Sequence, residues 1–306
     1  MIELVAQSQP MREAVGLAER VAATDANVLI TGESGSGKDA MASFIHQRSK
    51  RSSQPFIKID CATLPGHLLE AELFGYERGA FTGATDAKPG RLEAANRGTL
   101  VLDEIAYLAT DAQAKLLRVI ETRQFERLGG RRTIKVDARI IALTNVNLLE
   151  AIGRKNFRED LFYRLNVVHI RMPPLRARRD DLLELATGFV KGYARKHGRK
   201  ASSIDTNAMR LLEQYDFPGN VRELANTIER AVIVSEERSV NEGHLPDSLR
   251  AAVKALRGNN QRGTLAEMEA AYVNEILAAT KGNKSEAARI LGISRKNLYE
   301  RISRTK

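Results

Sequence analysis

Residues 32–39, with the sequence GESGSGKD, have the spacing of a phosphate-binding loop, G-x-x-x-x-G-K. They follow an apolar run over residues 27–31 that predicts a buried strand. In a strand–loop–helix setting, backbone amides and the helix N-terminus face phosphate oxygens, and the lysine reaches the β- and γ-phosphates. Nucleotide binding is therefore predicted for Gly32, Glu33, Ser34, Gly35, Ser36, Gly37, Lys38 and Asp39. Asp39 stands where a serine or threonine commonly supplies a hydroxyl ligand for magnesium.

Two carboxylates, Asp103 and Glu104, end a second apolar run at residues 98–104. Such a pair suits phosphoryl chemistry, with Asp103 holding Mg²⁺ and Glu104 polarising the attacking water. An acidic helix start after a strand is the simpler alternative, but the preceding phosphate-binding loop favours the catalytic interpretation. A third run, residues 138–143, ends in Thr144 and Asn145, at the strand end where ligands bind in open α/β sheets.

The hexapeptide GAFTGA, residues 79–84, has neither a helical nor a strand period. It is either a loop whose Phe81 is buried in the core or a surface loop that presents Phe81 and Thr82 to a partner. Taken alone, the hexapeptide favours the first alternative.

The elements that must position these residues alternate between strands and helices. Further strands are expected at residues 55–60 and 167–170, and helices at 11–23, 68–74 and 111–122, with a hairpin or loop at 129–132. This alternation predicts a parallel sheet covered by helices on both faces. After Pro174 no more strands are expected, and helical spacing continues over residues 181–194, 206–215 and 220–234, the last capped by Asn220.

The C-terminal part is strongly basic. The net charge of the chain is +10, and residues 281–306 hold eight basic and two acidic residues, which indicates a polyanionic partner. A helix from Thr264 is expected to precede two short helices, one ending at Gly292 and one capped by Ser294 with Leu298 and Ile302 inward. This pattern predicts a helix-turn-helix whose DNA-binding residues are Lys284, Ser294, Arg295, Lys296, Asn297, Tyr299 and Arg301.

Composition excludes several classes of protein. No run of 18 apolar residues exists and the N-terminus has no export signal, so neither a membrane span nor a membrane partner is expected. A single cysteine, Cys61, forms no intramolecular disulfide and fits the cytoplasm; it is interpreted as a buried residue, not a nucleophile. The sequence thus divides into an α/β domain (1–175), a helical lid (176–249), a linker (250–263) and the helix-turn-helix (264–306).

Seven segments together resemble one family over essentially the whole chain: GESGSGKD (32–39), ELFGYERGAFTGA (72–84), GTLVLDE (98–104), FREDLFYRL (157–165), PPLRARRDD (173–181), FPGNVREL (217–224) and GNKSEAARILGISRKNLYERI (282–302). The chain resembles the bacterial enhancer-binding proteins, NtrC-like activators of sigma-54 RNA polymerase that join an AAA+ ATPase core to a Fis-type DNA-binding domain and include response regulators. GAFTGA is the most specific of these motifs. An acidic residue after the loop lysine is usual in the family, so Asp39 fits.

The resemblance implies a role for each matching residue. Lys38 binds phosphate, Asp103 and Glu104 are the magnesium and water-activating carboxylates, and ATP and Mg²⁺ are the cofactors. Thr144 and Asn145 are similar to sensor I, and Arg222 to sensor II. Arg158 and Arg164 are similar to arginine fingers, which reach the nucleotide of a neighbouring subunit. The hexapeptide interpretation reverses, so that Gly79, Ala80, Phe81, Thr82, Gly83 and Ala84 contact sigma-54.

The resemblance also implies partners: sigma-54 RNA polymerase holoenzyme, enhancer double-stranded DNA, and further copies of the chain. Dimers through the C-terminal domain and a hexameric or heptameric ATPase ring are expected, in a cytoplasmic, nucleoid-associated bacterial protein.

Three positions depart from the family pattern. Asp60 replaces an asparagine that bonds the water-activating glutamate, and an ionised carboxylate there would repel Glu104 and alter the switch. Ala106 and Tyr107 follow the acidic pair in place of glycine and an acid, and Phe217 replaces a frequent tryptophan. Because Met1 begins almost at the ATPase core, the expectation is regulation in trans or a truncated chain.

Two other functions remain. One is a DNA-binding regulator that does not remodel sigma-54 and acts as a repressor or scaffold, which degenerate GAFTGA or acidic-pair residues would favour. The other is a general AAA+ remodeller of DNA, which the absence of the hexapeptide would favour. The intact motifs favour the activator.

Overall fold

The computed structural model describes residues 4–260, 269, 272–274, 276, 277, 280 and 283–304. Its contacts divide the chain into two compact units, Met1–Pro246 and Asp247–Lys306, each of which is described separately.

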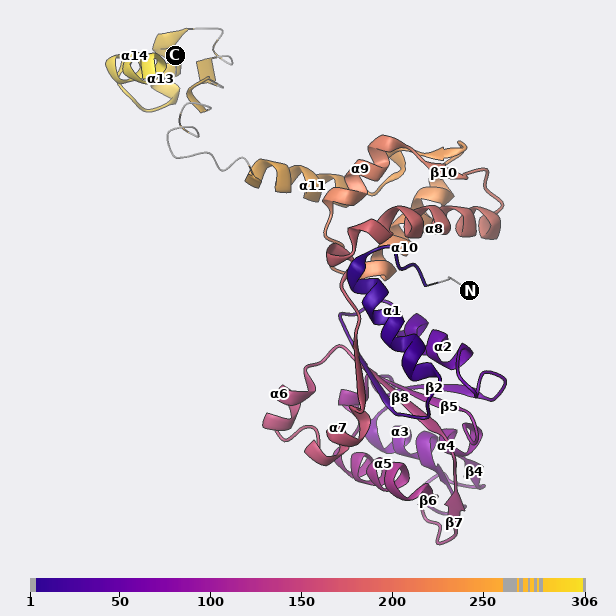
Figure 1. Cartoon of the computed structure of the whole chain (residues 1–306). Coiled ribbons are helices and arrows are strands. Elements are labelled where there is room, and N and C mark those ends of the chain that lie inside the picture. Colours follow the sequence, from indigo (N-terminus) through magenta and orange to yellow (C-terminus); the bar gives the residue numbers. More distant parts are fainter. Residues whose placement is uncertain are drawn as a thin grey trace. The chain divides into compact units, whose positions relative to one another are not determined.

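The first unit is built on a five-stranded parallel sheet (Figure 1). The strands are β1 (Val28–Thr31), β2 (Phe56–Asp60), β5 (Thr99–Asp103), β8 (Arg139–Thr144) and β9 (Val168–Arg171). Their order across the sheet is β2-β5-β8-β1-β9, so β1 lies between two strands that come much later in the sequence. The register pairs Thr31 with Thr144 and Asp60 with Asp103, which brings the polar strand ends to one edge.

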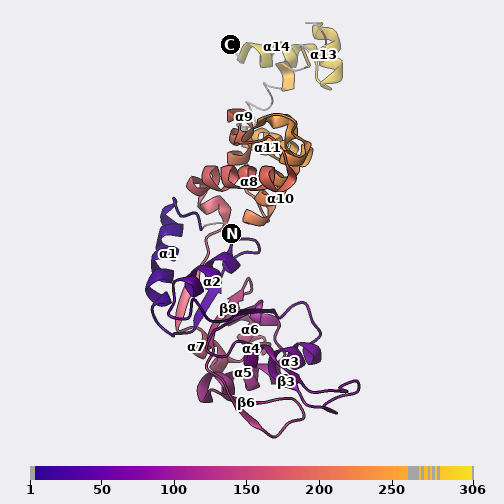
Figure 2. The same ribbon diagram turned by 90° about the vertical axis from the view of Figure 1, so that its right-hand side faces the viewer.

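Helices cover both faces of this sheet, as the sequence predicts (Figures 1 and 2). On one face Val28 and Ile30 pack with α1 (Gln9–Ala22) and α2 (Lys38–Gln47). Leu29, between them, points to the other face because side chains alternate along a strand. That face is covered by α3 (Gly66–Phe74), α4 (Arg91–Ala94), α5 (Thr110–Thr122), α6 (Leu148–Gly153) and α7 (Glu159–Leu165).

Two short antiparallel pairs extend from this unit. β3 (Gly75–Tyr76) pairs with β4 (Lys88–Pro89) and flanks the hexapeptide loop, and β6 (Gln124–Glu126) pairs with β7 (Thr133–Lys135). The hairpin expected at residues 129–132 is confirmed. A short 3₁₀ turn, η1 (Ile105–Tyr107), follows the acidic pair.

The predicted helical subdomain follows β9. It contains α8 (Leu182–His197), α9 (Thr206–Gln214) and α10 (Asn220–Val234), with 3₁₀ turns η2 (Leu175–Ala177), η3 (Arg179–Asp181) and η4 (Glu242–His244). The expectation of no further strands is wrong, because β10 (Ser203–Ile204) and β11 (Ser239–Val240) pair in parallel. Strands of two residues are too short to show a period in the sequence.

Asn220 does not cap α10 as predicted, since the cap position is Gly219. The Asn220 amide instead donates to Glu33 Oε2 and to the Ser34 carbonyl, both at 3.1 Å, and its oxygen accepts from the Leu175 amide at 2.7 Å. Asn220 has a positive φ of 53°, a conformation that asparagine tolerates better than most residues.

The second unit contains α11 (Asp247–Asn260), α13 (Lys284–Ile290) and α14 (Arg295–Arg304). The linker prediction for residues 250–263 is wrong for residues up to 260, which are helical: Leu249 and Val253 are one helical turn apart and both buried. The helix expected from Thr264 lies mostly outside the described residues, as does the side chain of Ile302. Leu298 packs with Val273, Ala287 and Ala288, as the inward position predicted for it requires.

The caps of the two short helices follow the sequence pattern. Ser294 Oγ accepts the Asn297 amide at 3.2 Å, which confirms the predicted cap. Gly292 has a φ of 66° and follows α13, and the Ile293 amide donates to the Ala288 carbonyl at 3.1 Å. These are the features of a helix end closed by a left-handed residue.

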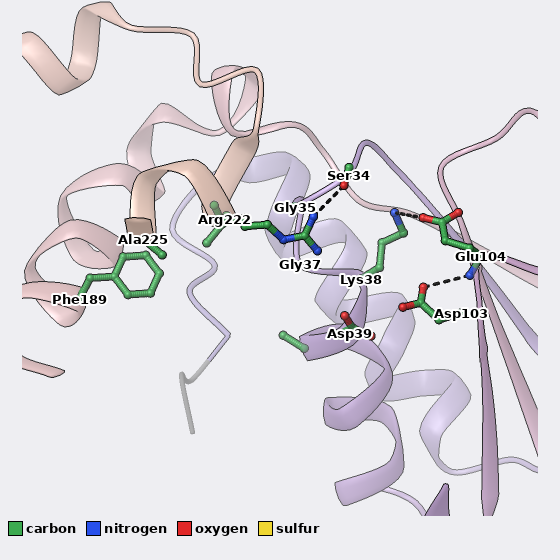
Figure 3. A pocket seen from close by; sticks show the side chains of 12 residues that line it. Ser34, Gly35, Gly37, Lys38, Asp39, Asp103, Glu104, Phe189, Arg222 and Ala225 are labelled. Carbon is green, nitrogen blue, oxygen red and sulfur yellow. Dashed lines mark hydrogen bonds and ion pairs between the residues drawn. The ribbon is translucent and has the colours of Figure 1, made fainter. Parts of the chain in front are cut away.

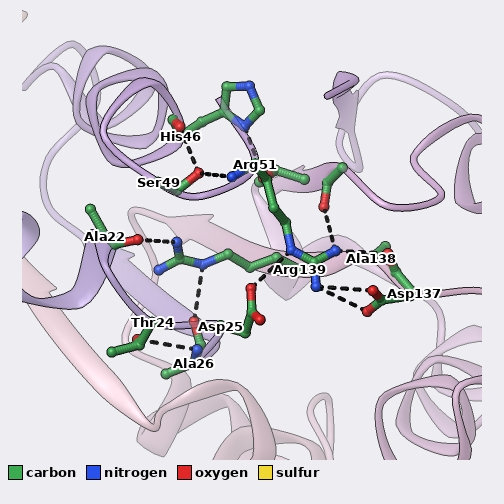
Figure 4. A network of polar contacts seen from close by, with 12 residues as sticks. Ala22, Thr24, Asp25, Ala26, His46, Ser49, Arg51, Asp137, Ala138 and Arg139 are labelled. Atoms are coloured by element: carbon green, nitrogen blue, oxygen red, sulfur yellow. Dashed lines mark hydrogen bonds and ion pairs between the residues drawn. The ribbon is translucent and has the colours of Figure 1, made fainter. Parts of the chain in front are cut away.

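Two arginines join segments that are distant in the sequence (Figure 4): Arg139, the first residue of β8, and Arg51, between α2 and β2. Arg139 is fully buried and donates to the carbonyls of Val21 and Ala22, at the C-terminal end of α1, and to that of Ala26, before β1. Arg51 bonds Asp25 at 2.9 Å and Asp137 at 3.0 Å. The network fixes α1 against β8.

Candidate functional site

The predicted phosphate-binding loop connects β1 to α2, and five of its residues line a cavity of about 270 Å³ (Figure 3): Ser34, Gly35, Gly37, Lys38 and Asp39. Lys38 is buried, and its Nζ donates to the Gly32 carbonyl at 2.9 Å. The same nitrogen lies 3.7 Å from Glu104 Oε1. The loop lysine and the second carboxylate are thus brought together, as the sequence predicts for a nucleotide site.

The acidic pair is held at the end of β5 by its neighbours. Asp103 Oδ1 accepts the Glu104 amide at 3.0 Å, and Oδ2 lies 2.7 Å from Lys58 Nζ. Glu104 Oε2 accepts the Asn145 amide at 3.1 Å and the Thr144 hydroxyl at 3.4 Å. The end of β8 therefore orients the carboxylate that stands beside Lys38.

Asp60 is bonded within its own segment of the chain. Its Oδ1 accepts the Ala62 amide at 2.8 Å, closing a local turn after β2. Among the described residues Glu104 is held by Thr144 and Asn145, and no hydrogen bond joins it to Asp60. The acidic replacement at residue 60 is thus accommodated by a backbone amide.

The lid contacts the phosphate-binding loop directly. Arg222 Nη1 donates to Ser34 Oγ at 2.8 Å, and Arg176 bonds both oxygens of Glu33, at 2.5 and 2.8 Å. Hydrogen bonds from Arg176 and then Asn220 lower the pKa of Glu33 from its ordinary 4.5 to about 2. The lid backbone also approaches closely, because a Cβ at Gly35 would lie 2.3 Å from the Gly219 carbonyl oxygen.

A magnesium ion fits this site only together with a nucleotide. Asp103 supplies a carboxylate at the cavity, but no group of three His, Cys, Asp or Glu able to hold a metal occurs in the described part of the chain. Magnesium is commonly held by one or two carboxylates and completed by phosphate oxygens and water. The donor set matches that arrangement.

Arg158 and Arg164 do not line the cavity at Lys38 in the described chain. Arg158 bonds Asp160 on its own chain at 2.7 and 3.0 Å, and Arg164 lies 3.0 Å from Glu121. The bond to Asp160 raises the pKa of Arg158. Both guanidinium groups are at the surface, where each is paired with a carboxylate.

The hexapeptide is an exposed loop between β3 and β4. Its ends are joined by the Gly79 amide, which donates to the Ala84 carbonyl at 2.8 Å. Phe81 remains 39% exposed and its ring lies 5.0 Å from the ring of Tyr76, so it is not a core residue. The β6–β7 hairpin packs against the loop, since a Cβ at Gly129 would lie 2.9 Å from Ala80 Cβ.

In the second unit, several residues predicted to bind DNA have contacts of their own. Lys284 Nζ lies 4.6 Å from the centre of the Tyr299 ring, Ser294 caps α14, and Arg301 pairs with Glu269. Arg295, Lys296 and Asn297 are exposed on the first turn of α14. This turn presents two cationic side chains, Arg295 and Lys296, at the start of a helix.

Sequence reasoning missed two charged residues that contact the site, Lys58 beside Asp103 and Arg176 beside Glu33. It also missed three apolar residues that line the cavity, Phe189, Val221 and Ala225. A lysine inside an otherwise apolar strand was a visible signal for Lys58. Cys61 is buried, as predicted, and burial raises the pKa of its thiol to about 12.

Three family descriptions match successive parts of the chain. Residues 4–171 match the sigma-54 interaction domain, residues 176–261 the AAA+ ATPase lid domain, and residues 264–304 the bacterial regulatory protein Fis family. None of the described helices has the length and apolar character needed to cross a membrane.

Individual proteins are similar along nearly the whole chain. Regulatory protein AtoC of Escherichia coli (strain K12) is 45% identical over 92% of this chain and 63% of its own length. Nitrogen fixation protein VnfA of Azotobacter vinelandii is 44% identical over 98% of this chain and 58% of its own length. The crystal structure of NtrX from Brucella abortus in complex with ATP has a TM-score of 0.74 and 37% identity, covering 99% of this chain and 69% of that one. The chain thus spans less than two thirds of the length of AtoC and VnfA.

Proposed function

Because the chain belongs to the family of sigma-54-dependent transcriptional activators, we propose that it hydrolyses ATP in an oligomeric ring to open promoters. Hydrolysis moves residues 79–84 against sigma-54 RNA polymerase, and the closed promoter complex becomes an open one. The observation that carries this proposal is the convergence of Lys38, Glu104 and the lid residue Arg222 on one cavity, in a unit that also exposes Phe81.

Four charged side chains at the cavity have a role in this proposal. Lys38 leaves the Gly32 carbonyl to bind the β- and γ-phosphates, and Glu104, oriented by Thr144 and Asn145, positions the attacking water. Arg222 leaves Ser34 and reaches the γ-phosphate from the lid. Asp103 would hold magnesium together with the phosphates, and the bound ion would neutralise phosphate charge.

The neighbouring subunit completes the site. Arg158 and Arg164 exchange their own carboxylates for the nucleotide of the adjacent subunit, where positive charge stabilises the transferring phosphoryl group. Hydrolysis then depends on assembly into a hexameric or heptameric ring. We further propose residues 1–175 as the ATPase domain, 176–249 as the lid and 264–306 as the DNA-binding domain.

The C-terminal domain binds enhancer DNA as a dimer, with Arg295, Lys296 and Asn297 entering the major groove. Lys284, Tyr299 and Arg301 contribute through contacts around the same helix, and Ser294 orients it. These partners place the protein at the bacterial nucleoid.

In vitro transcription with sigma-54 holoenzyme tests the proposal. ATP should support transcript formation by the wild-type protein, and a Glu104→Gln variant should bind ATP but give no transcript. DNA binding with ATP hydrolysis but without transcript would instead indicate a regulator that does not remodel sigma-54.

A further inference from the structure

Lys58 joins two carboxylates that the sequence places in different motifs. Its Nζ lies 2.5 Å from Asp39 Oδ1, at the start of α2, and 2.7 Å from Asp103 Oδ2, at the end of β5. β2 carries Lys58 alongside β5, with Lys58 in register with Val101. One ammonium group therefore bridges the phosphate-binding loop and the acidic pair.

The bridge balances charge at the cavity. The Asp103 side chain is only 15% exposed, whereas those of Lys58 and Asp39 are 38% and 54% exposed. Burial alone would lower the pKa of Lys58, but hydrogen bonds to Asp103 and Asp39 raise it above its usual range. Without the ammonium, two carboxylates would face each other at the site, which is unfavourable.

The oxygen that Lys58 occupies is also the oxygen open to a metal. Asp103 Oδ1 accepts the Glu104 amide at 3.0 Å, which leaves Oδ2 as the oxygen without a backbone donor, and Oδ2 lies 2.7 Å from Lys58 Nζ. An ammonium group and a divalent cation are both attracted to this negative oxygen, and because both are positive they repel each other when they are close.

We propose that Lys58 is a positioning residue that holds Asp39 and Asp103 together and must release Asp103 when a divalent cation binds with nucleotide. The inference rests on the proposed ATPase function and specifies how its metal requirement is set. Lys58 keeps the two motifs in place before nucleotide binds, then remains with Asp39 as the metal takes the Asp103 oxygen. The magnesium affinity of the nucleotide-bound protein is thus weakened by Lys58.

The test is a magnesium titration of ADP binding by the full chain, followed with N-methylanthraniloyl-labelled ADP, in the wild type and in Lys58→Met. Removing the competing charge should lower the magnesium concentration at half-saturation by about tenfold. In EDTA without nucleotide, Lys58→Met should melt at a lower temperature than the wild type, because Asp39 and Asp103 lose their shared partner. Magnesium with ADP should close that gap.

Two variants control the experiment. Lys58→Arg keeps a cation and should retain the wild-type magnesium requirement. Lys88→Met removes an ammonium group that pairs with one carboxylate, 2.9 Å from Glu72, and should leave the magnesium requirement unchanged. If Lys58→Met does not fold, Lys58→Gln is titrated in its place.

An unchanged or increased magnesium requirement in the Lys58 variant, with normal nucleotide binding by the wild type, overturns the inference and leaves the ATPase proposal intact. Failure of the wild type to bind ADP at any magnesium concentration overturns both.

Discussion

Arg158 and Arg164 are each bonded to a carboxylate of their own chain, and neither lines the cavity that contains Lys38. If they act on a neighbouring subunit, Arg158→Ala and Arg164→Ala should each lower ATP turnover by about a thousandfold, because a finger stabilises charge only in the transition state. Nucleotide binding by monomers should persist. Arg154→Ala, which removes an exposed arginine 3.8 Å from Glu150, is the matched control.

Mixing two inactive variants tests whether the arginines act on the nucleotide of a neighbouring subunit. Arg158→Ala retains an intact cavity and Lys38→Ala retains intact fingers, so mixing the two inactive variants should restore part of the turnover. Mixtures that stay inactive, or single arginine variants with normal turnover, would remove the trans role.

Glu33 gives the contact between lid and loop a pH dependence. Its pKa in the folded protein is about 2, below the ordinary 4.5, so pairing with Arg176 stabilises the folded state fully above pH 4.5. That contribution is lost as the pH falls from 4.5 toward 2. The melting temperature of the wild type should therefore exceed that of Glu33→Gln at pH 7 and approach it as the medium is acidified. The same difference in melting temperature between the two proteins at pH 7 and at pH 3.5 would contradict this linkage.

At the residue scale, the motif side chains could be predicted and their partners could not. The sequence places Asp103, Glu104, Thr144 and Asn145 at strand ends and Lys38 in the loop that follows a strand, and parallel pairing brings strand ends together. The hydrogen bond from the Ala62 amide to Asp60 was not visible in the sequence, because it depends on the local turn after β2. Lys58 meets Asp103 only through the pairing of β2 with β5.

Among the elements, the C-terminal end of α1 is bonded to β8 by one buried side chain, Arg139. Arg139→Met keeps much of the side-chain volume but removes the side-chain donor of the Ala22 and Ala26 carbonyls, whereas the Val21 carbonyl still accepts from Thr24. We expect a loss of about 2–3 kcal/mol in the free energy of unfolding, measured by urea denaturation, since unpaired buried acceptors are costly. Arg118→Met, at a side chain that is 67% exposed, should change it by less than about 0.5 kcal/mol. Equal effects of the two variants would show that Arg139 is not what holds α1.

α14 is the element that we expect to meet DNA. Arg295→Ala should weaken binding and reduce the steepness with which affinity falls as salt rises, because one fewer phosphate counterion is released. Affinity measured by fluorescence anisotropy at several salt concentrations checks this, with Lys254→Ala on α11 as the control. An unaltered salt slope in Arg295→Ala would count against a phosphate contact there.

The long elements followed from apolar periodicity, as the five strands of the sheet show. β10 and β11 escaped prediction because two residues carry no period, and α11 because its residues include glycine and asparagine near the end. Asn220 was expected to cap α10, but its amide satisfies Glu33 and Ser34, which are far away in the sequence.

For the whole molecule, the family membership and the order of its parts were readable from the motifs, since each motif is a continuous segment. The contacts that link these parts could not be read from the sequence. The lid reaches the phosphate-binding loop through Arg176, Asn220 and Arg222, and the hexapeptide touches the β6–β7 hairpin through Gly129. Such contacts join segments whose separation in the sequence is large.

The central claim is that ATP hydrolysis acts on the polymerase through the exposed hexapeptide. Thr82 is exposed and makes no hydrogen bond to another described residue through its side chain, so Thr82→Ala should preserve folding and ATP turnover. Thr133→Ala, at an exposed threonine on β7, is the matched control.

Promoter melting by sigma-54 holoenzyme, followed by permanganate reactivity with ATP present, tests this claim most directly. We predict that the wild type and Thr133→Ala melt the promoter, while Thr82→Ala hydrolyses ATP but yields about tenfold less open complex or none. Melting by Thr82→Ala at the wild-type level, or ATP hydrolysis by the wild type without any melting, would contradict the account.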